Sequence, residues 1–167
     1  MVKGNKKTIK AGETIPVIVK KGNADVLGRL SLLNRKQPHA VLATVSGNEP
    51  YTSLIAYAVT PDIKGLLFAT PRGTRKFSNL MKNRRVCLLI DSRSGTAGNY
   101  MKTESVTVIG KAGIVRKGRV REELARIFLK KHPLLTEFVR APSTSLILVK
   151  IIKCIHVSSF QIVSEWP

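Results

Sequence analysis

Two adjacent cations follow a hydroxyl residue at the point where a β-favouring stretch gives way to a helical one. Residues 66–69 are apolar, Thr70 and a Pro-Arg-Gly turn end the stretch, and Thr74 is followed by Arg75 and Lys76. The start of a helix carries backbone N–H groups without intrahelical partners, which favour an anion. An Arg fork and a Lys point charge add the contacts that suit a phosphate monoester. The segment therefore predicts a phosphate site, with solvated helix residues as the alternative for Arg75 and Lys76.

No side chain stands out as a catalytic acid, base or nucleophile, so the catalytic residues stay unassigned. His39 opens an apolar run, His132 precedes a proline, and His156 lies in the last β-favouring stretch. Cys87 and Cys154 each lie in an apolar run, where cysteine acts as a small buried hydrophobe. The sequence contains no CxxC pair and no ligand spacing among the histidines, so it gives no support for a metal site.

The net charge is the most unusual bulk property. The chain has 29 Lys and Arg against 10 Asp and Glu, a formal net charge of +19 at pH 7. This charge favours anionic ligands and makes nonspecific contact with nucleic acid plausible. The basic residues are spread from Lys3 to Lys153 and are not interleaved with aromatic residues, as a single-strand stacking platform would require. A noncatalytic protein that binds nucleic acid is therefore the less favoured alternative, from a different functional class.

The length and composition favour one globular domain. The chain has 167 residues, of which 43% are hydrophobic and 23% charged, the balance of an ordinary globular protein. Its apolar runs are far shorter than the ~20 residues that cross a bilayer. The basic N-terminus is not followed by the apolar run of a secretory signal, so we expect a cytoplasmic protein.

The hydrophobic pattern predicts many strands and few helices. Residues 1–23 are expected to form a basic arm with one edge strand, and residues 24–167 a single domain. Strands are expected at residues 39–45, 51–59, 66–70, 86–91, 105–115, 145–150 and 153–161. Helices are expected at residues 24–34, 75–83, 120–131 and 134–139. Hairpins join the first strands, so this order indicates a mainly β, closed or partly closed antiparallel barrel. A parallel α/β fold would need a helix after nearly every strand.

Several short segments within residues 39–115 occur in an order that carries a family resemblance. They are residues 41–45, 50–57, 67–70 with 74–76, and 80–91. Together they resemble the pyridoxamine 5'-phosphate oxidase-like family of FMN-binding split barrels. The resemblance implies a split β-barrel, antiparallel and Greek-key-like, with peripheral helices.

The resemblance also implies which residues hold the flavin. One strand would line the isoalloxazine ring and the ribityl chain with Ser53, Leu54, Ile55 and Ala56. Thr70 would contact the flavin, and the phosphate would be held by Thr74, Arg75 and Lys76. A polar loop would approach the cofactor with Ser92, Arg93 and Ser94, with a plain loop cation as the alternative for Arg93. Ser105 falls where vitamin-processing relatives have a glutamine.

In function, the resemblance implies an FMN-dependent oxidoreductase that acts on a small organic substrate, with a nicotinamide as a candidate electron donor. It further implies a homodimer with each flavin at the subunit interface. The last residues, 160–167, lack the Arg- and His-containing substrate segment of the vitamin-processing oxidases. Pyridoxamine phosphate oxidation itself is therefore not expected. A deazaflavin-dependent or haem-handling relative of the same fold and a flavin protein for storage or electron transfer remain alternatives.

Overall fold

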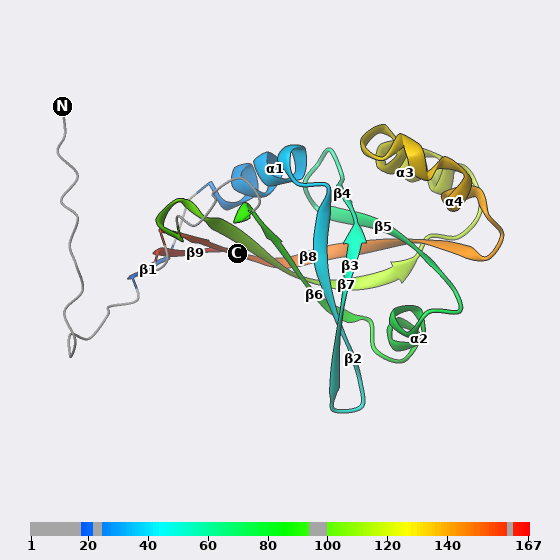
Figure 1. Ribbon diagram of the computed structural model, residues 1–167, viewed down its shortest axis with the longest axis horizontal. Coiled ribbons are helices and arrows are strands. Elements are labelled where there is room, and N and C mark those ends of the chain that lie inside the picture. The colour runs from blue at the N-terminus through cyan, green and yellow to red at the C-terminus, as the bar shows by residue number, and fades with distance from the viewer. Residues whose placement is uncertain (1–17, 22–24, 94–99, 160–161) are drawn as a thin grey trace.

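The structure is a computed structural model that describes residues 18–21, 25–93, 100–159 and 162–167. Within these residues, nine strands form one sheet with helices around it (Figure 1). The strands are β1 (Ile18–Lys21), β2 (His39–Ser46), β3 (Glu49–Ala56), β4 (Ala58–Val59), β5 (Gly65–Pro71), β6 (Arg85–Asp91), β7 (Glu104–Ile114), β8 (Thr144–Ser158) and β9 (Ile162–Trp166). The helices are α1 (Val26–Lys36), α2 (Arg75–Lys82), α3 (Arg119–Lys131) and α4 (Thr136–Arg140), with 3₁₀ turns η2 (Tyr100–Lys102) and η3 (Pro133–Leu135). No helix among these residues is long and apolar enough to span a bilayer.

The sheet is antiparallel and forked. Its main path runs β1-β9-β8-β7-β6-β2-β3, and among the described strands only the edge pair of β1 with β9 is parallel. The first part of β8 also pairs with β5, which in turn pairs with β4. In the described residues β3 and β5 share no strand pairing, so the sheet curls into a barrel that stays open between them. The predicted mainly β, antiparallel split barrel is confirmed.

The end of the chain corrects one expectation. Separate strands were expected at residues 145–150 and 153–161, whereas β8 is a single strand of 15 residues and β9 follows it. The register against β7 shifts between Ile109 and Gly110, so Ile152 is left without a partner. Such an extra residue is a β-bulge, which bends a strand without ending it. Because Ile152 is 55% exposed, the bulge disrupts the apolar alternation and resembles a strand boundary in the sequence.

The second expected strand, residues 51–59, is also divided. β3 ends at Ala56, and Ala58 and Val59 form β4, which pairs with β5 instead of β2. Tyr57 lies between the two strands and is fully buried. Because Tyr57 and its neighbours keep the apolar pattern where the pairing partner changes, the sequence shows no boundary.

Two apolar clusters lie on opposite faces of the sheet. Leu66 and Phe68 of β5 belong to the first cluster, whereas Leu67 belongs to the second, as the alternation of side chains along a strand requires. Helix α1 contributes Val26, Leu30 and Leu33 to the first cluster. Helix α3 covers the second cluster with Ala125 and Phe128. Helix α3 therefore covers β5 and the start of β8 on the outer face, whereas α1 packs against the barrel interior.

The outer face of the remaining sheet carries apolar side chains outside both clusters. One row crosses adjacent strands through register partners, and it consists of Leu54, Val41, Leu89, Thr107 and Ile155. A neighbouring row contains Ala43, Cys87 and Ile109. Leu54 is 67% exposed and Ile109 is 37% exposed. In the described residues, none of these side chains belongs to either apolar cluster.

Candidate functional site

The turn from β5 into α2 forms a polar corner. Thr74 caps the helix, because its hydroxyl oxygen accepts from the N–H of Phe77 at 3.4 Å and the hydroxyl donates to the Pro71 carbonyl at 2.9 Å. The hydroxyl of the buried Thr70 lies 3.0 Å from that of Thr74. Threonine is a preferred N-cap residue, which explains why α2 starts at Arg75 as expected. The capping bonds therefore bring the predicted Thr70 and Thr74 together.

The first turn of α2 offers further hydrogen-bond donors. In the part of the chain that the structure describes, nothing accepts from the backbone N–H groups of Arg75 and Lys76. The Arg75 guanidinium is 2.8 Å from a Glu49 carboxylate oxygen and 4.9 Å from the centroid of the Tyr51 ring. Open N–H groups at a helix start and an Arg nearby are the features of an anion site. An anion bound here would compete with Glu49 for Arg75.

β3 runs from this corner along the open side of the barrel. Ser53 and Ile55 face the interior opposite Leu42 and Ala40, whereas Leu54 faces outward. The Ser53 hydroxyl oxygen is buried and has no hydrogen-bond partner among the residues that the structure describes. Such an orphan is costly, and it calls for a water or a ligand as partner. Ala56, at the end of the strand, is half-buried against the second cluster.

A second group of predicted residues lies farther along β3. Leu54 and Arg93 line one cavity of about 230 Å³ together with His39. Arg93 is held by Asp91, with its Nε 2.9 Å from the carboxylate. Leu54 is three residues beyond Tyr51, or about 10 Å along an extended strand. The structure thus places Thr70, Thr74, Arg75 and Lys76 near the start of β3, and Leu54 and Arg93 together farther along it.

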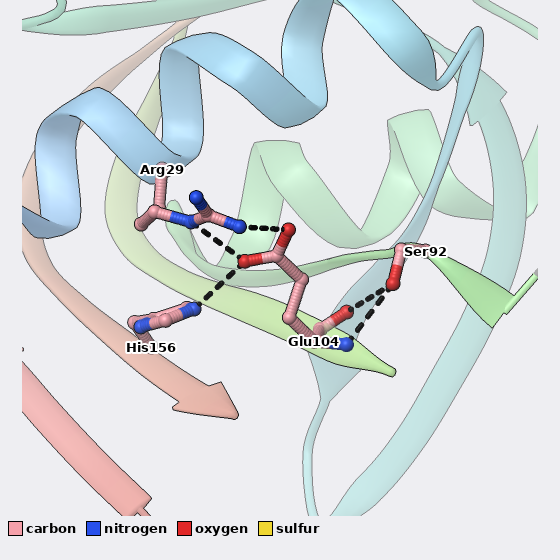
Figure 2. A network of polar contacts seen from close by, with 4 residues as sticks. All are labelled: Arg29, Ser92, Glu104 and His156. Carbon is pink, nitrogen blue, oxygen red and sulfur yellow. Dashed lines mark hydrogen bonds and ion pairs between the residues drawn. The ribbon is translucent and has the colours of Figure 1, made fainter. Parts of the chain in front are cut away.

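The remaining predicted residues lie where β6 meets β7. The Ser92 N–H donates to the Glu104 carbonyl oxygen at 3.0 Å. The Ser92 hydroxyl also donates to that carbonyl at 3.3 Å and accepts from the Glu104 N–H at 3.0 Å (Figure 2). Ser105 is half-buried opposite Asp91 in the register of β6 and β7. Ser94 lies outside the described residues. Ser92 therefore joins the two strand ends, whatever further contact it makes.

Sequence reasoning missed a carboxylate network beside Ser92. Figure 2 shows the Glu104 carboxylate between Arg29 of α1 and His156 of β8. The Nε of Arg29 is 2.7 Å and the Nε2 of His156 is 3.0 Å from the same oxygen. Burial would raise the pKa of Glu104, but the hydrogen bonds and charges of Arg29 and His156 outweigh it and lower the pKa below its ordinary value. The network therefore holds a charged carboxylate under α1.

A second missed cluster surrounds Tyr57. The Lys131 ammonium lies 3.7 Å from the centroid of the Tyr57 ring and donates to the Asn34 side-chain oxygen at 2.9 Å. The imidazole of His132 contacts the Tyr57 carbonyl oxygen at 2.8 Å. Burial lowers the pKa of Lys131 to about 7, and in the described part of the chain the buried Tyr57 hydroxyl has no hydrogen-bond partner. In sequence, the only signal is a Lys before a His-Pro pair, which is common at helix ends.

Comparisons with known proteins agree with the fold. The family model described as pyridoxamine 5'-phosphate oxidase matches residues 30–157. A haem-binding protein from Mycobacterium smegmatis superimposes with a TM-score of 0.73 at 13% identity, covering 87% of this chain and 59% of that one. An FAD-binding protein from Mesorhizobium loti gives a TM-score of 0.59 at 19% identity, covering 77% of this chain and 91% of that one. The chain thus spans about three fifths of the mycobacterial protein. No curated protein matches the sequence.

Proposed function

The chain belongs to the pyridoxamine 5'-phosphate oxidase-like family of split barrels, and from that premise we propose that it binds FMN and acts as an oxidoreductase on a small organic substrate. One observation carries the proposal: the β5–α2 corner places Thr70, Thr74 and the open N–H groups of α2 beside two cations. A phosphate monoester is the ligand that satisfies donors and charge together.

The residues present fit a phosphate-bearing flavin at both ends of β3. Thr74, Arg75 and Lys76 would hold the phosphate, and the orphaned Ser53 hydroxyl is a candidate contact for the polar chain of the cofactor. The cavity that contains Leu54 and Arg93 offers an apolar surface and a cation at the other end. Bound flavin would supply electron or hydride transfer, and the protein would supply orientation and charge. A cation such as Arg93 would favour the anionic reduced form.

We further propose that the protein forms a homodimer with the flavin between its subunits. The row from Leu54 to Ile155 leaves apolar side chains on an uncovered sheet face. Apolar surface of this kind is usually covered by a partner. Leu54 belongs both to this row and to the cavity of Arg93. A second subunit covering the row would therefore also cover the proposed flavin site.

The phosphate contact is tested by replacing Arg75 and Lys76 together with Ala. We expect the Kd for FMN, measured by quenching of flavin fluorescence, to rise about tenfold or more, because each charged hydrogen bond is worth ~1.5–3 kcal/mol. The chain offers a matched control, since Arg35 and Lys36 form the same dipeptide on α1 and are exposed, whereas Arg75 is exposed and Lys76 half-buried. Ala at both control positions should leave the Kd unchanged.

Equal FMN affinity in the two folded double variants would overturn the phosphate site. Replacing Glu49 with Gln provides a further check on the same corner. Because Glu49 contacts Arg75, its removal should lower the Kd for FMN by a few-fold. This gain in FMN affinity should disappear in a variant that also lacks Arg75. The effects of Glu49 and of Arg75 on FMN binding would then both depend on the Arg75 guanidinium.

The haem-binding relative of similar fold makes haem the second candidate cofactor, with a deazaflavin as a third. The absorption spectrum of the purified protein separates them, because flavin, deazaflavin and haem absorb at different wavelengths. Mass spectrometry of the released cofactor checks the assignment. A Soret band in place of a flavin spectrum would replace FMN by haem in the proposal.

A further inference from the structure

A groove between β7 and α3 lies apart from the proposed flavin site. Its cavity of about 630 Å³ is formed by the end of β7, residues 115–118 and the start of α3. None of its lining residues belongs to the residues predicted to contact the flavin. We call this cavity the β7–α3 groove. Its size falls in the range of cavities that take small organic ligands.

The rim of the β7–α3 groove is cationic. The charged side chains that line it are Arg84, Lys111, Arg116, Lys117, Arg119 and Lys150. No acidic residue lines the groove. Arg119 forms an ion pair with Glu123 at 3.0 Å, and within the described chain the other five cations have no ion pair. The rim therefore attracts an anion, and local charge does not neutralise it.

The floor of the groove is aliphatic and open. It includes Leu124 and Leu148, and the exposed fractions of Ile114 and Val120 are 42% and 63%. Gly113 also lines the floor, and a Cβ added there would meet no atom within 4 Å. Exposed aliphatic surface beside open space is unfavourable in water. An occupant with an apolar body would cover it.

We infer that the β7–α3 groove binds an alkyl chain with an anionic head group, either a phosphate or a carboxylate. The cations on the rim would contact the head group, and the aliphatic floor would cover the chain. Nucleic acid suits the groove less well, because no aromatic side chain lines it for stacking. A second copy of the protein suits it less well too, because a two-fold contact centred here would bring cations against cations.

The test uses four probes on the full-length protein, by isothermal titration calorimetry with and without FMN. Octyl phosphate and octanoate combine an alkyl chain with an anionic head, octyl glucoside has the chain without charge, and inorganic phosphate has the charge without the chain. We expect either of the first two to bind at least tenfold more tightly than octyl glucoside and inorganic phosphate. The tighter of the two identifies the head group.

Two variants locate the binding. Replacing Arg116 and Lys117 with Ala should lower the affinity for the tighter-binding probe about tenfold or more. Gly113→Ile should weaken it as much by filling the floor, and the open space at that position keeps the fold intact. The matched Arg35 and Lys36 double variant should bind as the wild type does. FMN affinity should be the same in all these variants, so failure here is distinguishable from failure of the flavin proposal.

Several results would overturn the inference. One is equal affinity of the probe in all variants. Another is equally tight binding of inorganic phosphate or of octyl glucoside, which would reduce the groove to a charge or an apolar patch. A third is displacement of the probe by an oligonucleotide whose binding is weakened by the Arg116 and Lys117 double replacement but not by Gly113→Ile. That result would make the groove part of a surface that binds nucleic acid.

Discussion

Lys131 is an ammonium group that folding removes largely from water. Its contacts are the Tyr57 ring and the Asn34 side-chain oxygen, and burial lowers its pKa from 10.5 to about 7. The unfolded chain therefore binds more protons than the folded chain between these two values. By linkage, the free energy of unfolding should rise with pH across this window. Below about pH 7 both states are protonated and the dependence ends.

Replacing Lys131 with Met should flatten this pH dependence. Between about pH 7 and pH 10 the wild type should gain about 1–2 kcal/mol more than the variant, less than the full linkage because the amine keeps part of its hydration. Urea denaturation midpoints at several pH values measure the difference. Lys130→Met is the matched control, because the neighbouring Lys130 is exposed and should keep the wild-type slope. Parallel curves for wild type and Lys131→Met would contradict the buried amine.

At single residues, the sequence predicts local contacts better than distant ones. Thr74 could be predicted as a helix cap because its partner Phe77 is three positions away. The contact of Arg75 with Glu49 joins positions 26 apart, and that of Arg29 with Glu104 joins positions 75 apart. Such pairs depend on strand register, which no local pattern specifies. The candidate phosphate corner was therefore accessible from the sequence, whereas its acidic competitor was not.

At the scale of elements, the close pairing of β7 with β8 depends on Gly110. A Cβ at this position would lie 2.6 Å from the Lys150 carbonyl oxygen and 2.5 Å from a Val149 methyl. The backbone atom cannot move without shifting β8, which is the strand that pairs with both parts of the forked sheet. The close approach coincides with the register shift beside Ile109.

Gly110→Ala should therefore lower the free energy of unfolding by about 1–3 kcal/mol through overpacking. Gly113→Ala is the control on the same strand, because a Cβ there meets nothing within 4 Å, and its effect should stay within about 0.5 kcal/mol. Urea denaturation of both variants measures the difference. Equal stability of the two variants would show that the β7–β8 pairing can adapt to the added methyl group.

Helices and strands that end at a turn residue or a proline were predictable from the sequence. A strand that continues through a β-bulge was not. The hairpin of β2 and β3 follows from the turn after Ser46, and α3 ends before Pro133 as expected. β8 appeared as two strands because Ile152 bulges outward. Its continuity depends on β7 along one edge and on β5 and then β9 along the other, partners that only the folded sheet supplies. The barrel type was thus predictable, but the fork that shapes it was not.

For the whole molecule, the apolar outer face and the charge of +19 act in opposite directions on assembly. Positive charge favours separate subunits through repulsion, while the rows that contain Leu54 and Ile109 favour a covered face. The second row ends beside Lys153, whose ammonium is neutralised by Glu165 at 2.7 Å. This pairing removes one cation from the edge of the face. The balance of the two effects should therefore favour a dimer through this face.

Ile109→Arg and Thr107→Arg each add a charge to this face and should yield monomers in sedimentation velocity experiments, because a two-fold contact would bury the unpaired guanidinium. Leu134→Arg adds the same charge at a side chain that is 97% exposed elsewhere on the surface, and it should remain a dimer. Because the cavity of Leu54 and Arg93 adjoins the face, the monomeric variants should also bind FMN more weakly than Leu134→Arg does. Folded dimers in both face variants would contradict the interface. Monomers with undiminished FMN affinity would keep the interface and place the flavin within one subunit.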